Sequence, residues 1–330
     1  MYRLQEPRRT QGTPKLWLVP VANKKLQEFF YLDYLANITM ITRRKLTKLI
    51  ARLVSAACFF ALNIHAQADN RLLHFKTSYK SGTETVQSLT IKEMHNSFVE
   101  IERQLFDIQY KAHRGYKGFD LREVLAFAGF EPGATLMLVC EDGYKITLDT
   151  SVLDDPDVQG MIATSDLAPT ESENWELYPH GRELVSFDPF YVVWSKQSDS
   201  GPAPSQETLS LLKKLPWPYQ FQEIRDLQES DYIAAKPSSD ASTEIHEGFS
   251  QYMDNCYKCH QVSGVGGTLA PALDRAGSIA STLPLEPLSK MIRNIKDYYP
   301  LTKMPNYTDT LTEKEALEVA AYLKYVIGTH

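Results

Sequence analysis

The chain has 330 residues, of which 43% are apolar and 23% are charged, and its formal net charge is −6. This composition excludes an intrinsically disordered chain, and the length leaves room for two domains that each bury a core. The four cysteines, Cys58, Cys140, Cys256 and Cys259, are too few for a disulfide scaffold in a chain of this length. The small disulfide-rich class is therefore excluded.

Residues 40–68 have the pattern of an export signal: a basic start, an apolar run over 53–64 and the small-x-small triplet Ala66-Gln67-Ala68. The apolar run is short for a membrane span of about 20 residues, so we expect cleavage after this triplet. The alternative is retention as an N-terminal membrane anchor. Residues 1–39 show no pattern of their own and are expected to be a misassigned or disordered leader, with the true start at Met40. The expected location is the bacterial periplasm.

The export signal also changes the charge of the mature chain. Residues 1–68 hold 11 of the 35 basic and 3 of the 41 acidic residues, so the rest holds 24 basic and 38 acidic residues, a net charge of −14. A protein this acidic is a poor partner for nucleic acid or an anionic membrane. We expect it to dock with proteins that present a basic surface.

The next segment, residues 69–233, mixes β-rich and helix-like stretches and is expected to be an α+β domain with a mixed sheet. Apolar and β-branched runs predict strands within 135–148 and 184–195. Apolar periodicity predicts helices over 92–106 and 119–130. This segment is called the upstream domain below.

Residues 234–243, AAKPSSDAST, are small and polar, which is typical of a linker, and residues 244–330 form a second domain. In this domain Cys256, Cys259 and His260 form a Cys-x-x-Cys-His motif. One turn of backbone carries all three side chains on one side, so the thiols can add to the two vinyl groups of a haem while the imidazole binds the iron. A zinc site would need a second Cys/His pair, and a thioredoxin-type pair would need a βαβ setting. The motif therefore predicts one covalently bound haem c.

Residues 243–328 closely resemble the monohaem class I cytochrome c domain, which is all-α. Gly248 and Tyr252 stand where that family has a glycine and an aromatic residue on its N-terminal helix. The C-terminal stretch LTEKEALEVAAYLKYVIG corresponds to the partner helix, opened by a capping box at Thr312–Glu315 and carrying Tyr322 inward. The glycine is expected to let the two helices cross closely.

The second axial ligand that the resemblance implies is Met304, in the loop KMPNY just ahead of the last helix. His246 and His330 are weaker candidates for this position. Met291 lies in the helix-like run PLSKMIRNIKDYY, and we interpret it as a core residue instead.

Pro271, in GGTLAPALD, resembles the family proline whose carbonyl oxygen accepts the Nδ1 proton of the proximal histidine, here His260. The sequence departs from the family pattern in having Gly266-Gly267-Thr-Leu-Ala before Pro271 instead of a bare Gly-Pro. With His260 and Met304 both bound, the iron has no open position, so the resemblance implies one-electron transfer and no catalysis at the haem. Peroxide reduction or gas sensing would need an open iron.

Residues 118–148, GFDLREVLAFAGFEPGATLMLVCEDGYKITL, resemble the molybdopterin-binding oxidoreductase domain of the sulfite oxidase kind. The shared features are a Gly-x-x-Leu-x-x-x-Leu helix, an Ala-Gly turn, a strand and Asp142-Gly143-Tyr144, and the resemblance extends over about 75–228. That family binds molybdenum through a cysteine upstream of this helix, yet residues 69–117 contain none. Cys140 is the remaining candidate, and its apolar surroundings favour a buried core thiol. Molybdopterin binding is therefore in doubt.

These observations leave two main hypotheses. The first is an electron carrier with one haem c, in which a cofactor-free upstream domain serves for docking with redox proteins. The second is a fused molybdopterin enzyme that oxidises or reduces a small substrate and passes electrons to its own haem. The second needs a metal-bound thiolate, and Cys140 would have to supply it.

Overall fold

The computed structural model describes residues 71–78, 84–167, 175–180, 183–198, 201 and 203–329. All described residues belong to one compact unit, residues 66–330. The predicted leader and export signal, residues 1–68, lie outside the described residues. Among the residues that are described, no helix is long and apolar enough to cross a membrane.

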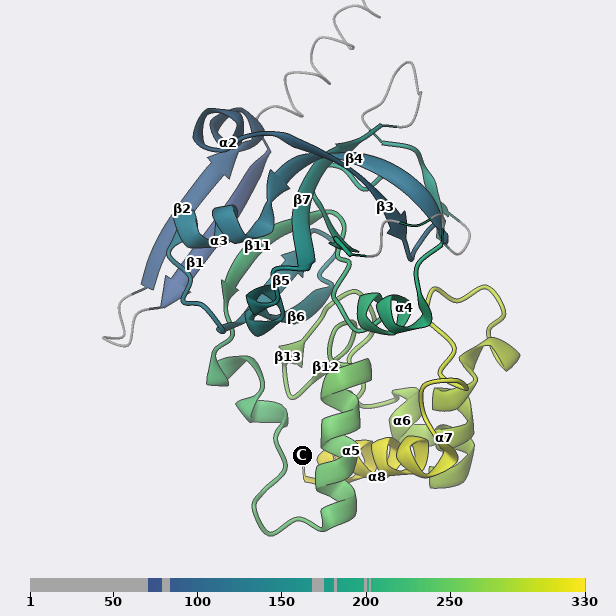
Figure 1. The fold of residues 1–330 in the computed structure, drawn as a ribbon. Coiled ribbons are helices and arrows are strands. Elements are labelled where there is room, and N and C mark those ends of the chain that lie inside the picture. The colour runs from purple at the N-terminus through teal and green to yellow at the C-terminus, as the bar shows by residue number, and fades with distance from the viewer. Residues whose placement is uncertain are drawn as a thin grey trace, which may run out of the picture. The chain divides into compact units, whose positions relative to one another are not determined.

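In the described part of the upstream domain, one sheet has five strands in the order β2-β1-β11-β5-β6 (Figure 1). The strands are β1 (Leu72–Ser78), β2 (Glu84–Thr90), β5 (Thr135–Cys140), β6 (Lys145–Asp149) and β11 (Phe221–Asp226). β1 and β11 run parallel, and the other neighbouring pairs run antiparallel. The strands predicted within 135–148 are confirmed as β5 and β6.

A second sheet of the same region has four described strands, in the antiparallel order β10-β7-β4-β3. The strands are β3 (Ile101–Asp107), β4 (Ala112–Asp120), β7 (Val158–Asp166) and β10 (Tyr191–Lys196). A separate hairpin joins β8 (Tyr178–His180) to β9 (Glu183–Val185). The strand run predicted within 184–195 corresponds to β9 and β10.

Short helices connect these strands. They are α2 (Ile91–Ser97), α3 (Leu121–Ala128) and α4 (Gln206–Leu212), with 3-10 turns η1 (Thr150–Asp154), η2 (Glu229–Asp231) and η3 (Ile233–Ala235). The helix predicted over 119–130 is confirmed as α3. It begins where the Asp120 side chain accepts a hydrogen bond from the Arg122 amide, and it ends at Gly129 in the left-handed conformation. The predicted α+β class with a mixed sheet is therefore present.

The single helix predicted over 92–106 is wrong in its second half, because the chain leaves α2 after Ser97 and continues as strand β3. The inward positions of β3 include Arg103 and Asp107, which read as solvent-facing in the sequence. Both are engaged inside: Arg103 pairs with Asp120, and Asp107 accepts the hydroxyl of Tyr116 at 2.6 Å. Asp107 is buried and Arg103 is partly buried, so polar residues on the inner face concealed the two-residue period of a strand.

The C-terminal domain is helical, as predicted, with α5 (Thr243–Asn255), α6 (Ile279–Thr282), α7 (Leu285–Arg293), η4 (Ile295–Asp297) and α8 (Glu313–Thr329). A small hairpin, β12 (Gln261–Val262) with β13 (Val265–Gly266), follows the Cys-x-x-Cys-His motif. α5 and α8 cross (Figure 1). A Cβ on Gly248 would lie 2.1 Å from the Glu318 carbonyl oxygen, which confirms that the glycine permits this close crossing.

The predicted capping box of the last helix is present, because the Thr312 amide donates to Glu315 at 2.7 Å and the Glu315 amide donates to Thr312 at 3.2 Å. Tyr322 is fully buried, as predicted, and its hydroxyl donates to the Ala235 carbonyl at 2.6 Å. The predicted linker therefore begins packed against α8. Ser238 continues this contact through the hydroxyl of Tyr325 at 3.0 Å.

Two hydrophobic cores result. One belongs to the upstream domain and includes Phe75, Phe119 and Trp194, and the other belongs to the C-terminal domain and includes Tyr252, Val319 and Tyr322. The upstream domain contributes to the second core as well: Met137 of β5 is fully buried in it, and Val139 and Leu227 pack against it.

Candidate haem site

Helix α5 places the first cysteine of the motif. The Ser242 side chain caps the helix by accepting from the Ile245 amide, and the helix ends with Cys256 at its C-cap. The amides of Cys259 and His260 then both donate to the Cys256 carbonyl, at 3.0 and 2.9 Å. This tight turn holds the two thiols and the imidazole together directly after the helix.

His260 is oriented by its other ring nitrogen. Its Nδ1 lies 2.7 Å from the Pro271 carbonyl oxygen, so Nδ1 carries the proton and Nε2 is left with a lone pair. Burial lowers the pKa of His260, with the Pro271 carbonyl acting in the opposite direction. The imidazole is therefore held neutral, which is the form that binds iron. This hydrogen bond is the contact that the family resemblance implied for Pro271.

The glycine pair that departs from the family pattern lies against the backbone of the motif. A Cβ on Gly266 would lie 2.3 Å from the His260 carbonyl oxygen, and one on Gly267 would lie 2.1 Å from that of Lys258. Gly266 also has a φ of +113°, which side chains disfavour. The pair thus lets β13 pass directly under the haem-binding turn.

Met304 lies in the loop between η4 and α8 and is half-buried against the second core. Its amide donates to the Thr302 hydroxyl at 3.2 Å. The loop is tied to the end of α5 because the Tyr307 hydroxyl donates to the Asn255 carbonyl at 2.8 Å. The loop therefore holds Met304 near the residues that follow α5.

A single cavity of about 610 Å3 brings the predicted residues together, since it is lined by Cys256, Cys259, His260 and Met304. A volume of this size is typical of cofactor and ligand sites, and this lining is mainly apolar. Burial raises the pKa of Cys256 to about 12 and that of Cys259 to about 11. Two thiols, a neutral imidazole and a thioether around one apolar cavity fit a haem that is bound through two thioether bonds and two axial ligands. The ligand roles of these residues remain predictions.

The competing candidates lie elsewhere. His246, in the first turns of α5, does not line this cavity, and His330 lies outside the described residues. Met291 is buried in α7, as predicted for a core residue, and does not line the cavity either. Met304 is thus the methionine that the described structure brings to the two cysteines and the histidine.

The cavity has a second wall that the sequence analysis missed. Cys140, Tyr144, His180 and Tyr219, all from the upstream domain, line the same space. Tyr144 was noted only as part of the Asp-Gly-Tyr motif of the molybdopterin-type family. No local pattern could have placed it here, because the motif cysteines that share the cavity with it are more than 100 positions away in the chain.

Cys140 is buried in the upstream core, as predicted, and burial is the main cause that raises its pKa well above the usual thiol range. It is therefore held as a neutral thiol, whereas a metal ligand is a thiolate. Its position at the edge of the cavity is nevertheless unexpected, because the strand pattern predicted a core role alone.

Residues 243–323 match the family model described as cytochrome C oxidase, cbb3-type, subunit III. A search of curated proteins finds no match to the chain. The C-terminal domain is therefore a cytochrome c domain, whose chemistry is electron transfer through covalently bound haem c. The match does not extend into the upstream domain, and the sulfite oxidase-like identity of that domain is a prediction only.

Proposed function

We propose that this protein is an exported, periplasmic c-type cytochrome that carries single electrons through one haem c with His260 and Met304 as axial ligands. The observation that carries the proposal is the single cavity lined by these two residues together with Cys256 and Cys259. A bound haem c supplies one-electron chemistry between ferrous and ferric iron. Since both axial positions would be filled by the protein, this is the chemistry of a carrier.

Each residue has a separate task in this proposal. Cys256 and Cys259 hold the cofactor covalently, so it stays bound in both oxidation states. Pro271 fixes the tautomer of His260 and keeps Nε2 free for the iron. Met304, a soft and weak ligand, favours the reduced state and so raises the reduction potential.

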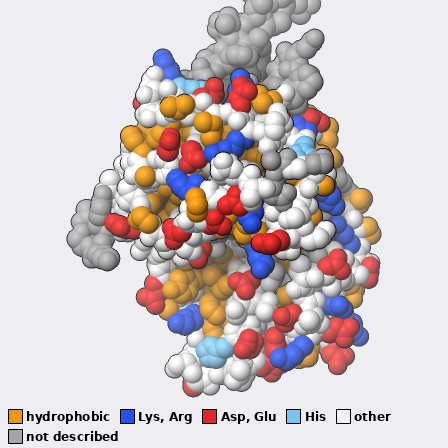
Figure 2. Space-filling view, viewed as in Figure 1, with side chains coloured by type: hydrophobic (Ala, Val, Ile, Leu, Met, Phe, Trp, Pro, Cys, Tyr) orange, Lys and Arg blue, Asp and Glu red, His pale blue; other side chains and the backbone are white. Residues whose placement is uncertain are grey.

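The upstream domain is proposed to be a sulfite oxidase-like module without a molybdenum cofactor. It is the source of the acidic charge: residues 244–330 hold 10 acidic and 8 basic residues, whereas residues 69–233 hold 27 and 15. On the face shown in Figure 2, acidic and basic side chains are interspersed. We infer that a basic redox partner is attracted by the upstream domain more than by the cytochrome domain.

A second candidate function is the molybdopterin enzyme, which the position of Cys140 at the haem cavity favours. A metal bound there would share this cavity with the haem. The high pKa of the thiol argues against it, because a metal would first have to displace the proton.

The test of both candidates is a combined optical spectrum and metal analysis of protein purified from the periplasm of its own host. The carrier requires a low-spin haem spectrum, one iron per chain and no stoichiometric molybdenum. One molybdenum per chain, lost together with turnover in Cys140→Ser, would establish the enzyme instead.

A further inference from the structure

Strand β5 belongs to both cores. Successive side chains of β5 enter different cores. Leu136, Leu138 and Cys140 are buried in the upstream core, whereas Met137 is buried in the cytochrome core and Val139 packs against that core. Because successive side chains of a strand point to opposite faces, one face of β5 serves each domain. The upstream sheet therefore forms part of the packing of the cytochrome domain.

The turn between β5 and β6 is hydrogen-bonded to the haem-binding segments. The Lys145 amide donates to the Lys258 carbonyl, inside the Cys-x-x-Cys-His motif, at 2.9 Å. The Thr268 amide donates to the Gly143 carbonyl, also at 2.9 Å. These are backbone bonds of the kind found within a domain, so the turn is docked against the motif itself.

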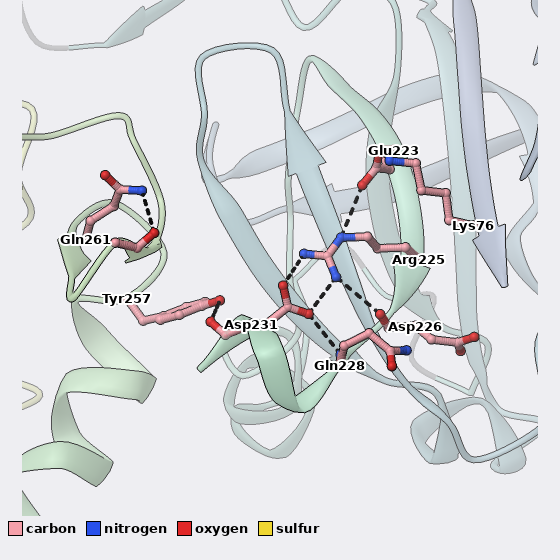
Figure 3. Close-up of polar contacts among 9 residues, drawn as sticks. Lys76, Glu223, Arg225, Asp226, Gln228, Asp231, Tyr257 and Gln261 are labelled. Atoms are coloured by element: carbon pink, nitrogen blue, oxygen red, sulfur yellow. Dashed lines mark hydrogen bonds and ion pairs between the residues drawn. The ribbon is translucent and has the colours of Figure 1, made fainter. Parts of the chain in front are cut away.

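A third contact involves Tyr257, which lies with Lys258 between the two cysteines of the motif. Figure 3 shows Tyr257 pointing toward η2, where its hydroxyl donates to the Asp231 carbonyl at 2.8 Å. The Asp231 carboxylate is held by two bonds from Arg225, at 2.5 and 2.6 Å, and by the Gln228 amide at 2.8 Å. Arg225 is itself paired with Glu223 on β11 at 3.1 Å. A two-bond arginine pair of this kind is rigid, so η2 is a firm support for the motif.

The Met304 loop is attached as well. Lys303, next to the predicted ligand, forms an ion pair of 2.7 Å with Glu183 of β9. In the same hairpin His180 Nδ1 lies 2.6 Å from the Tyr219 hydroxyl, and both side chains line the haem cavity. The upstream domain thus contacts both segments that carry the predicted axial ligands.

We propose that the upstream domain is the second half of the haem pocket: Tyr144, His180 and Tyr219 face the haem, and the contacts described above close that side to water and to other proteins. The inference rests on the proposed function, because it requires the haem to occupy this cavity. Electrons then enter and leave through parts of the haem edge that the upstream domain does not cover. Exclusion of water disfavours the more highly charged ferric state, so the closed pocket raises the reduction potential.

Two glycines of the upstream domain provide a matched test. A Cβ on Gly143 (φ +86°) would lie 1.9 Å from the Thr268 hydroxyl, whereas a Cβ on Gly133 (φ +74°) would meet nothing within 4 Å. Gly143→Ala and Gly133→Ala carry a similar backbone penalty, because both glycines have a positive φ. Only Gly143→Ala also places a methyl group against Thr268 and pushes the β5–β6 turn away from the segment that contains Thr268. We expect Gly143→Ala to lower the equilibrium constant for reduction of the haem about tenfold. For one electron this is a decrease of about 59 mV in the midpoint potential. Gly133→Ala should leave it unchanged.

A second substitution that removes this clash is the accompanying control. Thr268→Ala removes the hydroxyl that a Cβ at Gly143 would strike. The double variant Gly143→Ala/Thr268→Ala should therefore regain most of the lost potential. Potentials are measured by optical redox titration of the haem-loaded protein.

A second experiment uses substitutions at exposed residues only. Glu183→Lys replaces attraction to Lys303 by repulsion at an exposed site, and Glu102→Lys does the same to the exposed pair with Lys117, on a strand that does not line the haem cavity. The readout is the affinity of the ferric haem for added imidazole, a ligand that must displace Met304. We expect Glu183→Lys to increase this affinity up to about fivefold, since an exposed ion pair contributes up to about 1 kcal/mol. Glu102→Lys should leave it unchanged.

The outcomes separate this inference from the proposed function. If wild-type protein carries no covalent haem, the proposed function fails. If haem is attached but Gly143→Ala and Gly133→Ala have equal potentials, the upstream domain does not close the pocket. If Gly143→Ala does not fold, the imidazole affinities decide, and equal values for the two lysine variants overturn the inference.

Discussion

Replacement of Gly248 by alanine tests the packing on which the cytochrome domain depends. The added Cβ would lie 2.1 Å from the Glu318 carbonyl oxygen and 2.8 Å from the Tyr322 Cβ, whereas ordinary contacts begin at 3.4 Å. The close atom is backbone, so no side-chain rotation relieves the clash, and α5 and α8 must separate by about 1 Å.

The magnitude follows from two opposing terms. Overpacking against a rigid neighbour costs about 3 kcal/mol, at the upper end of the usual range. The change from glycine to alanine within a helix returns about 1 kcal/mol. We therefore expect Gly248→Ala to lower the free energy of unfolding by about 2 kcal/mol. Gly328→Ala is the control, because a Cβ there would meet nothing within 4 Å.

The assay is guanidinium unfolding of the haem-loaded protein, followed by the haem absorption, with the slope of the transition compared among wild type and both variants. Gly328→Ala should be as stable as wild type or slightly more stable. If the two variants unfold within about 0.5 kcal/mol of each other, the helices do not cross closely at Gly248 and the reasoning is wrong.

Three further predictions concern the cofactor and export. Met304→Ala should remove the sulfur–iron charge-transfer band from the ferric spectrum and lower the potential, whereas Met291→Leu should change neither. Cys256→Ala should leave a haem with a single thioether bond, which is visible as a changed pyridine haemochrome spectrum. Cys140→Ala should leave the normal spectrum. A Cys140→Ala protein without haem would contradict the prediction that only Cys256 and Cys259 hold the cofactor. Mass spectrometry of the exported protein should find Asp69 as the first residue, and a mature chain that retains the apolar run would show that the signal is an anchor.

The cytochrome domain was largely predictable because its determinants are local. The Cys-x-x-Cys-His spacing fits within one turn of backbone, and the capping box spans three residues, so each can be read without knowledge of the fold. The helix predicted over 92–106 failed for the opposite reason. Arg103 and Asp107 are polar residues on the inner face of β3, and their partners Asp120 and Tyr116 lie on another strand.

The second wall of the haem cavity was not predictable for the same physical reason. His180 and Tyr219 are 39 positions apart, and each is more than 30 positions from the motif cysteines. Neither belongs to a periodic pattern that points toward a cofactor. Their position depends on how the two domains dock, which is determined by contacts that no local stretch contains.

Strand β5 shows how such docking leaves a trace in a sequence without revealing its meaning. The run LMLVC is apolar at every position, whereas a strand with one face in water alternates apolar with polar residues. Unbroken apolarity therefore indicates that both faces are covered, but it does not say by what. The structure assigns Leu136 and Leu138 to the upstream core and Met137 to the cytochrome core. A cytochrome domain expressed without this strand would expose part of its own core, so we expect the isolated domain, residues 244–330, to be less stable than the same domain in the full chain. Unfolding of both forms, followed by the haem absorption, measures the difference, and equal midpoints would show that β5 contributes nothing to the cytochrome core.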